Sequence, residues 1–436
     1  MEVERARSEV SAIFDAVLRA LDPATLVQKA ISIDENAVTV HDARYELNAS
    51  GRIVVLGVGK SAVGMARGVE ASLGSHLSEG LVVTKRGLGG EQDALQHTTV
   101  RESSHPVPDK SSVESGEELL RRAEALSEHD LAIVVISGGG SALIEAPIDG
   151  ISLDDFKTTT SLLLKTGADI STLNAVRRRL SRIKAGGLAR AIAPAKVINL
   201  ILSDVLGNPL HVIASGPTVA PDVNDREWIE RLRSQDVWQS FPDPVREVLE
   251  KDTVDEPITN VLANVVIGDA FAAATAAVDA AGQHGYKPFL LGAAFTGEAR
   301  EFACFWASLA LSTVRGHSSI ERPACLIGAG ETTVTVRGDG IGGRNTEMAV
   351  AAALEIEGMD DVAIASLATD GDDGVSDATG GVVVGDSVSR LRDAGFDPVK
   401  LLAENDTRTF LDAVGGLIVT GQTGINVNDL YLALVV

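Results

Sequence analysis

The sequence predicts an α/β protein whose first domain is Rossmann-like, with a doubly wound and mostly parallel sheet. Three observations predict this class. Short apolar runs, typical of strands buried on both faces, alternate with helical patterns through the first half of the chain. Glycine-rich turns follow several of these runs, as they do where α/β sheets bind ligands. With 436 residues the chain has room for two or three domains.

The composition indicates an acidic protein with a packed core. Hydrophobic residues make up 45% of the chain, and the formal net charge is −23. A charge of this sign repels nucleic acid and anionic membranes, so we expect a small-molecule substrate and neither of those partners. No apolar run approaches about 18 residues, and the charged, amphipathic start predicts no secretory signal peptide. We therefore expect a cytoplasmic protein, either a monomer or a homodimer.

The first elements end in a turn that favours an anion. Apolar residues from Val10 to Leu21 recur at helical spacing, and Asp22-Pro23 ends this helix and begins the next. Residues 53–64 (IVVLGVGKSAVG) then predict a buried strand, a glycine turn and a helix. Backbone N–H groups and the helix dipole attract an anion at such a turn, and Lys60 adds a positive charge. We expect phosphate or carboxylate there.

Two known motifs compete for this turn. Gly57, Gly59 and Ala62 match the dinucleotide fingerprint G-x-G-x-x-A, which also needs an acidic residue about 20 positions later. The next apolar run ends at Lys85 instead, which disfavours NAD and leaves NADP open. A P-loop would need glycine where Val54 stands. A plain turn with a surface lysine is the remaining alternative.

A second anion-binding turn follows the apolar strand predicted over residues 131–136. It contains Gly138, Gly139, Gly140 and Ser141. Three consecutive glycines let backbone N–H groups approach an oxyanion closely, so we expect this turn to bind the phosphates of a cofactor; a plain turn is the alternative. Residues 87–108, between the two turns, are expected to form a polar loop that presents His105 or Asp109 to a cleft.

The rest of the first domain supplies cations and a carboxylate. Ser152 and Asp155 predict a capping box, and a cationic helix is expected over residues 174–184. Most of its cations should lie in solvent, but we assign Asn174, Arg177 and Lys184 to the cofactor. A strand over residues 197–202 leads to Asp204. Polar residues 219–257 are interpreted as a linker, which divides the chain into domains 1–255 and 256–436.

The second domain adds an arginine and acidic loops. A glycine-rich loop over residues 338–343 places Arg344 at a helix start, which suits bidentate recognition of carboxylate or phosphate. Glu331 follows another apolar run. Asp370 and Asp373 lie in an acidic loop after the strand at residues 363–367, and their oxygens suit Mg²⁺. A solvated turn is the competing interpretation of that loop.

These groups together are those that phosphoryl transfer requires. The reaction needs a phosphate-binding turn, cations for the developing charge, Mg²⁺ and a positioned hydroxyl acceptor. We therefore interpret the chain as a kinase that uses ATP and Mg²⁺. Asp204, Glu331, Asp370 and Asp373 are the pool for a base or metal ligands; we assign Asp204 to catalysis and the other three to the metal.

Ten short motifs, each unspecific alone, occur in an order that is specific for one family. They are GVGK (57–60), HPVPD (105–109), SGGGSA (137–142), NAVR (174–177), SDV (203–205), ASGPT (214–218), GETT (330–333), GGRN (342–345), TDG (369–371) and NVND (426–429). On these motifs nearly the whole chain resembles the glycerate 2-kinases, often labelled hydroxypyruvate reductases, whose C-terminal part is the MOFRL domain.

The resemblance implies a Rossmann-like domain and an α/β MOFRL domain, with the active site in the cleft between them. It also implies that Lys60 and Arg344, one from each side, are catalytic. We expect ATP-dependent phosphorylation of the 2-hydroxyl of D-glycerate. Arg179, Asn208 and Gln422 depart from the residues usual in the family. Another small sugar acid therefore remains an alternative substrate. The G-x-G-x-x-A match and the reductase label of the family leave an NAD(P)H-dependent hydroxypyruvate reductase as a second alternative, and a non-enzymatic sugar-acid-binding protein is the third.

Overall fold

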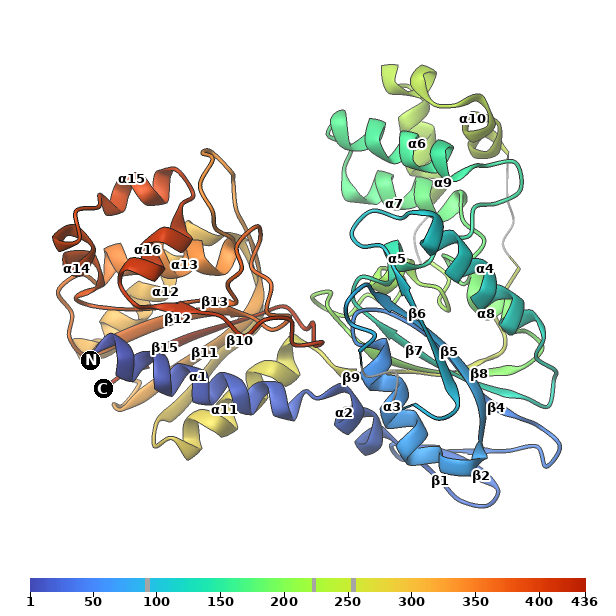
Figure 1. Ribbon diagram of the computed structural model, residues 1–436, viewed down its shortest axis with the longest axis horizontal. Coiled ribbons are helices and arrows are strands. Elements are labelled where there is room, and N and C mark those ends of the chain that lie inside the picture. Colours follow the sequence, from blue (N-terminus) through green and yellow to red (C-terminus); the bar gives the residue numbers. More distant parts are fainter. Residues whose placement is uncertain (91–94, 222–224, 252–255) are drawn as a thin grey trace. The chain divides into compact units, whose positions relative to one another are not determined.

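The computed structural model describes residues 1–90, 95–221, 225–251 and 256–436 (Figure 1). They form two compact units. The N-terminal unit comprises Pro23–Ser203 and Asn208–Ile267, and the C-terminal unit comprises Met1–Asp22, Asp204–Gly207 and Gly268–Val436. The boundary expected between residues 255 and 256 adjoins residues 252–255, which lie outside the described ones. The cleft between domains stays a prediction, and each unit is described by itself.

The N-terminal unit is built on a six-stranded sheet in the order β6-β5-β4-β7-β8-β9. The pairings β6–β5, β5–β4, β4–β7 and β7–β8 are parallel, and β4 and β7 are buried along their whole length. This is the strand order of a dinucleotide-binding sheet, so the predicted Rossmann-like sheet is confirmed. The strands are β4 (Ile53–Val58), β5 (Leu77–Lys85), β6 (Thr98–Ser103), β7 (Leu131–Ser137), β8 (Lys196–Leu202) and β9 (Val261–Gly268).

Helices and a small sheet complete this unit. The capping box of α6 forms as predicted, with Ser152 at the N-cap and Asp155 at the third position. The small sheet pairs β1 (Ile31–Ile33), β2 (Ala37–Val40) and β3 (Ala43–Glu46). The helices are α2 (Pro23–Ala30), α3 (Ala62–Leu73), α4 (Lys110–Glu124), α5 (Gly140–Leu143), α6 (Leu153–Lys165), α7 (Ile170–Arg179), α8 (Gly187–Ile192), α9 (Asp225–Arg233) and α10 (Asp243–Glu250), with the 3₁₀ turns η1 (Gly74–His76), η3 (Ile213–Ser215) and η4 (Asp236–Ser240).

Three sequence predictions for this unit were wrong. The loop expected over residues 87–108 contains strand β6, and residues 91–94 lie outside the described ones. The helix expected over 174–184 ends at Arg179. The linker expected over 219–257 contains α9, η4 and α10, which bury Trp238 and Phe241 in a cluster with Phe156 of α6; residues 222–224 and 252–255 are not described. Amphipathic helices of this kind contribute to the core of the unit.

The C-terminal unit has a second six-stranded sheet, in the order β10-β11-β15-β12-β13-β14. Strands β10 and β11 pair in parallel, and the other pairings in the sheet are antiparallel. Helices α12, α13 and α16 cover one face, and α1 and α11 cover the other (Figure 1). The strands are β10 (Lys287–Glu298), β11 (Ala324–Thr333), β12 (Val362–Ala368), β13 (Gly380–Val384), β14 (Leu417–Ile418) and β15 (Asp429–Val435), and the helices are α1 (Val3–Ala20), α11 (Ala270–Gln283), α12 (Ala299–Val314), α13 (Arg344–Glu355), α14 (Ser387–Asp393), α15 (Pro398–Ala403) and α16 (Thr407–Ala413).

Helix α1 joins this unit although it begins the chain. It buries one face, including Val10, Phe14 and Val17, against α11 and β13. The helical spacing predicted for these residues is therefore confirmed. Of the helices in the described ranges, none has the length and apolar character that crossing a membrane requires.

The aromatic core of the C-terminal unit gives a test of this packing. Trp306 of α12 is fully buried. Its ring centroid lies 5.5–6.2 Å from the ring centroids of Phe295, Phe302 and Tyr431. We expect Trp306→Ala to lower the free energy of unfolding by about 3–5 kcal/mol, because it leaves a large cavity. Phe305, its neighbour, is 51% exposed, so Phe305→Ala should cost far less. Urea unfolding followed by circular dichroism compares them, and equal losses would contradict the packing described.

Candidate active site

Two turns meet where the strand order of the N-terminal sheet reverses, after β4 and β7. Gly59 follows β4 with φ +135°, and a Cβ there would lie 2.1 Å from Ser137 Oγ. The backbone N–H of Lys60 donates to the carbonyl of Gly138 at 2.9 Å, and that of Ser61 donates to Ser137 Oγ at 3.0 Å. These bonds hold the turns side by side. This is the position at which doubly wound sheets bind ligands.

Lys60 and His105 flank the second glycine of the triplet. Gly139 has φ +82°, and a Cβ placed on it would lie 3.4 Å from Lys60 Cγ and 3.1 Å from His105 Nε2. Ser141, in α5, has its Oγ 2.7 Å from Ser215 Oγ. The structure therefore brings the predicted Lys60 to the predicted turn of Gly138, Gly139, Gly140 and Ser141. It also brings His105 to this turn, one of the two residues that the loop was expected to present to a cleft.

Lys184 does not lie as the sequence predicted. Its side chain is 1% exposed, and its ammonium donates to Glu145 Oε2 at 2.7 Å and to the carbonyl of Ile144 at 3.4 Å. Ile144 is the C-cap of α5, the short helix that the glycine turn begins. Burial lowers the pKa of Lys184, and the charge of Glu145 acts in the opposite direction. This geometry corrects the assignment: Lys184 anchors the segment behind the glycine turn, with its ammonium enclosed by protein.

Arg177 is the cation of this region that best suits an anion. Its guanidinium lies 5.9 Å from the ring centroid of Phe156, and burial lowers its pKa. Within the described ranges no acceptor is hydrogen-bonded to its buried Nε. Asn174 lies one turn earlier on α7 and is half-buried. Arg178 is buried too, paired with Asp225, so the expectation that most of these cations lie in solvent was wrong.

In the C-terminal unit, Arg344 lies between two carboxylates. It begins α13, as predicted, directly after Gly343. Its Nε and Nη2 donate to the two carboxylate oxygens of Asp429 at 2.6 and 3.1 Å, and its Nη1 donates to Glu331 Oε1 at 2.7 Å. Asp429 is fully buried, whereas the side chains of Arg344 and Glu331 are 31% and 43% exposed. The guanidinium is thus fixed by a buried carboxylate on one side and paired with a partly exposed carboxylate on the other.

Sequence analysis did not assign Asp429 to the site. Burial raises its pKa to about 7, and the two bonds from Arg344 act in the opposite direction. Because both of its oxygens accept from the guanidinium, this geometry stabilises the ionised pair. The available signal was an aspartate at the start of an otherwise apolar final strand, as the last residue of the NVND motif.

Asp204 joins the same network. Asn428 donates from Nδ2 to the carbonyl of Asp204 at 2.7 Å and to Glu331 Oε2 at 3.2 Å. Asn426 Nδ2 lies 3.4 Å from Asp204 Oδ2. The structure therefore brings together three predicted residues, Asp204, Glu331 and Arg344, through two asparagines that the sequence marked only as part of a motif.

The three predicted metal ligands do not fit a magnesium site in this geometry. Asp373 is buried and accepts hydrogen bonds from the backbone N–H groups of Asn345 and Thr346, at 2.9 and 2.8 Å, and from their side chains. It caps α13, and burial raises its pKa. Glu331 is paired with Arg344, and Asp370 accepts a bond within its own turn. Across residues 1–90, 95–221, 225–251 and 256–436, no group of three or more His, Cys, Asp or Glu side chains could hold a metal ion.

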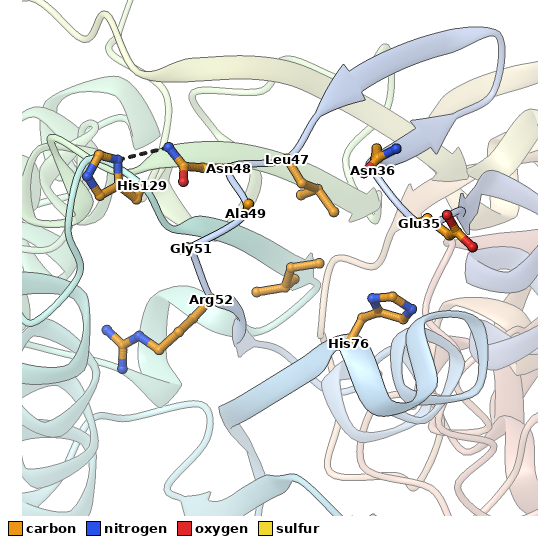
Figure 2. A pocket seen from close by; sticks show the side chains of 10 residues that line it. Glu35, Asn36, Leu47, Asn48, Ala49, Gly51, Arg52, His76 and His129 are labelled. Carbon is orange, nitrogen blue, oxygen red and sulfur yellow. Dashed lines mark hydrogen bonds between the residues drawn. The ribbon is translucent and has the colours of Figure 1, made fainter.

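A separate pocket of about 300 Å³ lies at the opposite, amino-terminal edge of the N-terminal sheet (Figure 2). It is lined by residues 51–53 at the start of β4, by His76 and by His129, whose Nδ1 is 3.0 Å from Nδ2 of Asn48. Arg52 pairs there with Asp130 and Glu79. The predicted anion-binding groups lie at the other ends of the strands, so this pocket is distinct from the candidate active site.

Comparisons with known proteins cover nearly the whole chain. Residues 9–250 match the model of a domain of unknown function (DUF4147), and residues 324–429 match the MOFRL family. The chain is 37% identical over 426 residues to the glycerate 2-kinase of Pyrococcus horikoshii, covering 96% of this chain and 94% of that protein. It is 36% identical over 422 residues to the D-glycerate 2-kinase of Thermotoga maritima, covering 95% and 100%. The crystal structure of a Thermotoga maritima glycerate kinase superposes with a TM-score of 0.87 at 34% identity, covering 99% of this chain and 100% of that one.

The buried pair behind the glycine turn gives a test of the site. Glu145→Gln leaves the ammonium of Lys184 buried without a charged partner, so we expect the free energy of unfolding to fall by about 3–5 kcal/mol. Glu117 pairs with Arg182 at the surface, and Glu117→Gln should cost less than about 1 kcal/mol. Denaturant unfolding of the two variants makes the comparison. Replacing both buried partners, in Lys184→Met/Glu145→Leu, should recover most of the lost stability. Equal losses of stability in Glu145→Gln and Glu117→Gln would refute the structural role of the buried pair.

Proposed function

Because the chain belongs to the glycerate 2-kinase family, we propose that it phosphorylates D-glycerate. The γ-phosphoryl group of ATP passes to the 2-hydroxyl, giving 2-phosphoglycerate and ADP. The observation that carries the proposal is Arg344, a partly exposed guanidinium held by a buried carboxylate. Such a preorganised cation stabilises charge in a phosphoryl-transfer transition state.

Each group of the site has a proposed part in the reaction. The turn of Gly138, Gly139, Gly140 and Ser141 binds the phosphates of ATP, supported by Asn174 and Arg177. Lys60, beside Gly139, stabilises charge on the transferring phosphoryl group. The substrate oxygen forms its bond to the γ-phosphorus while the bond from that phosphorus to the β–γ bridging oxygen breaks. Asp204 accepts the proton of the hydroxyl, and Arg344 binds the phosphoryl group or the carboxylate of glycerate.

ATP is expected to act as its magnesium complex, in which the metal neutralises phosphate charge. Since Glu331, Asp370 and Asp373 do not fit a metal site, no protein group is proposed to hold the ion. We place the enzyme in the cytoplasm, where ATP is available.

A coupled assay tests the reaction and its regiochemistry together. The protein is incubated with ATP, Mg²⁺, D-glycerate and enolase, without phosphoglycerate mutase. Enolase accepts 2-phosphoglycerate directly, so we expect absorbance from phosphoenolpyruvate in step with ADP release. ADP release without that absorbance would show phosphorylation at the 3-hydroxyl and overturn the proposed regiochemistry.

Two further arms of this assay address the alternatives. In the first arm, other small sugar acids replace D-glycerate. ADP release with one of these acids, and none with D-glycerate, would identify that acid as the substrate. The G-x-G-x-x-A turn on a sheet of dinucleotide-binding order motivates the second arm, in which oxidation of NADH or NADPH by hydroxypyruvate is followed. Turnover there with no ADP release from any sugar acid would identify a reductase and refute the kinase.

The two proposed catalytic cations should each be essential. We expect Lys60→Ala and Arg344→Ala to lower turnover on the order of 10³-fold, as loss of a charge-stabilising cation does in other phosphoryl-transfer enzymes. Lys110, 90% exposed and paired with Glu114, serves as the matched control, and Lys110→Ala should retain full activity. Turnover of Lys60→Ala within about tenfold of the parent enzyme would remove Lys60 from the catalytic machinery.

A further inference from the structure

The two carboxylates that bind Arg344 differ in how firmly they are held. Asp429 is fully buried at the start of β15, where its backbone is paired with Gly330 of β11 and Ala368 of β12. Glu331 lies towards the end of β11, and its side chain is 43% exposed. Moving the buried carboxylate of Asp429 away would break its two hydrogen bonds with Arg344, which carries a large cost in free energy in a protein interior. The exposed carboxylate of Glu331 can turn into water with only a small loss of free energy.

The charges at this point oppose the binding of an anion. Arg344 contributes one positive charge, and Asp429 and Glu331 contribute two negative ones, all within hydrogen-bonding distance. A phosphate or carboxylate brought to the guanidinium would meet this excess of negative charge. Nη1 already donates to Glu331 Oε1, at 2.7 Å. A ligand oxygen that approaches Nη1 therefore competes with Glu331 for the guanidinium, and departure of that carboxylate favours the binding of an anion.

We propose that Glu331 is a displaceable counter-ion of Arg344, which an anionic substrate group replaces, while Asp429 stays as the permanent partner. In this role Glu331 occupies Nη1 of the guanidinium until the ligand arrives, so the arginine is kept oriented and is not left with an unpaired donor. Glu331 has a second hydrogen bond, which its Oε2 accepts from the side-chain amide of Asn428 at 3.2 Å. This distance is at the long end for a hydrogen bond, so the bond is easily broken. Asn428 keeps its shorter bond to the carbonyl of Asp204 at 2.7 Å.

This inference rests on the proposed function for the identity of the ligand, but the test does not require turnover. Inorganic phosphate and D-glycerate are titrated separately, without ATP, and affinity is taken from the rise of Tm with ligand concentration. We expect Glu331→Gln to bind one of the two anions about fivefold more tightly than the parent protein, the gain expected when an exposed ion pair no longer competes. The anion that gains identifies which group Arg344 receives.

A matched control separates displacement from a general change in charge. Glu357 forms an exposed pair with Arg392 and has a side chain 38% exposed, so Glu357→Gln removes the same charge at similar exposure. It should leave both affinities unchanged. In Glu331→Gln/Arg344→Lys the gain should disappear, because lysine cannot offer the same fork of donors.

Unchanged or weaker binding of both anions by Glu331→Gln would overturn the proposal, and weaker binding would indicate that Glu331 helps to hold the ligand. A gain that survives in Glu331→Gln/Arg344→Lys, or that Glu357→Gln reproduces, would overturn it as well. Failure of the kinase assay alone leaves this result intact, so the two proposals fail separately. As a kinetic check, Glu331→Gln should lower KM for D-glycerate where glycerate is the anion that gains, and KM for ATP where phosphate is, a change that a purely structural role would not produce.

Discussion

The site in the C-terminal unit depends on one interaction, the pair between Arg344 and the buried carboxylate of Asp429. A guanidinium with two donors fixed by one carboxylate has a defined plane and direction. The carboxylate is fixed in turn, because Asp429 begins a strand that is paired on both sides. Removing Arg344 would leave the fully buried carboxylate of Asp429 without its counter-charge, which is far more costly than losing a surface ion pair.

A second buried carboxylate supports the same residue from the other direction. Asp373 accepts four hydrogen bonds from Asn345 and Thr346, the residues that follow Arg344 in α13. A Cβ on Gly343 would lie 2.4 Å from Asp373 Cγ, so glycine is needed where the loop passes this cap. The start of α13 is therefore fixed by a buried cap while its first side chain is fixed by the sheet. Both carboxylates position the arginine that is proposed to be catalytic, without being candidates to touch substrate.

Sequence patterns predicted the elements that are buried on both faces and missed those that are half exposed. Strands β4 and β7 are continuous apolar runs, which the sequence marks clearly. Strand β6 (TTVRES) lies at the edge of the sheet, with half of its residues exposed, and has no apolar run to mark it. The helices within residues 219–257 bury few large side chains each, so a polar composition concealed them. Burial of one face is enough to stabilise a helix in the folded protein, but it leaves only a few apolar residues as a signal in the sequence.

The candidate site shows the same division. The glycine triplet was predictable because the turn needs a positive φ at Gly139. Lys60 and Arg344 were predictable because each stands next to a glycine turn or at a helix start, where an anion is favoured. The roles of Lys184, Asp373 and Asp429 were not, because each depends on a partner distant in sequence: Glu145, the start of α13 and Arg344. A carboxylate that binds a metal and one that caps a helix are the same residue type in the sequence. Only the donors around it distinguish the two.

A double-mutant cycle between Arg344 and Asp429 tests the central claim most directly. Turnover of D-glycerate is measured for Arg344→Ala, Asp429→Asn and the double variant. If Asp429 acts by holding Arg344, Asp429→Asn lowers kcat/KM, and the double variant is no slower than Arg344→Ala alone. Losses that multiply in the double variant would show that Asp429 acts independently of the arginine, and would contradict the dependence of the site on this ion pair.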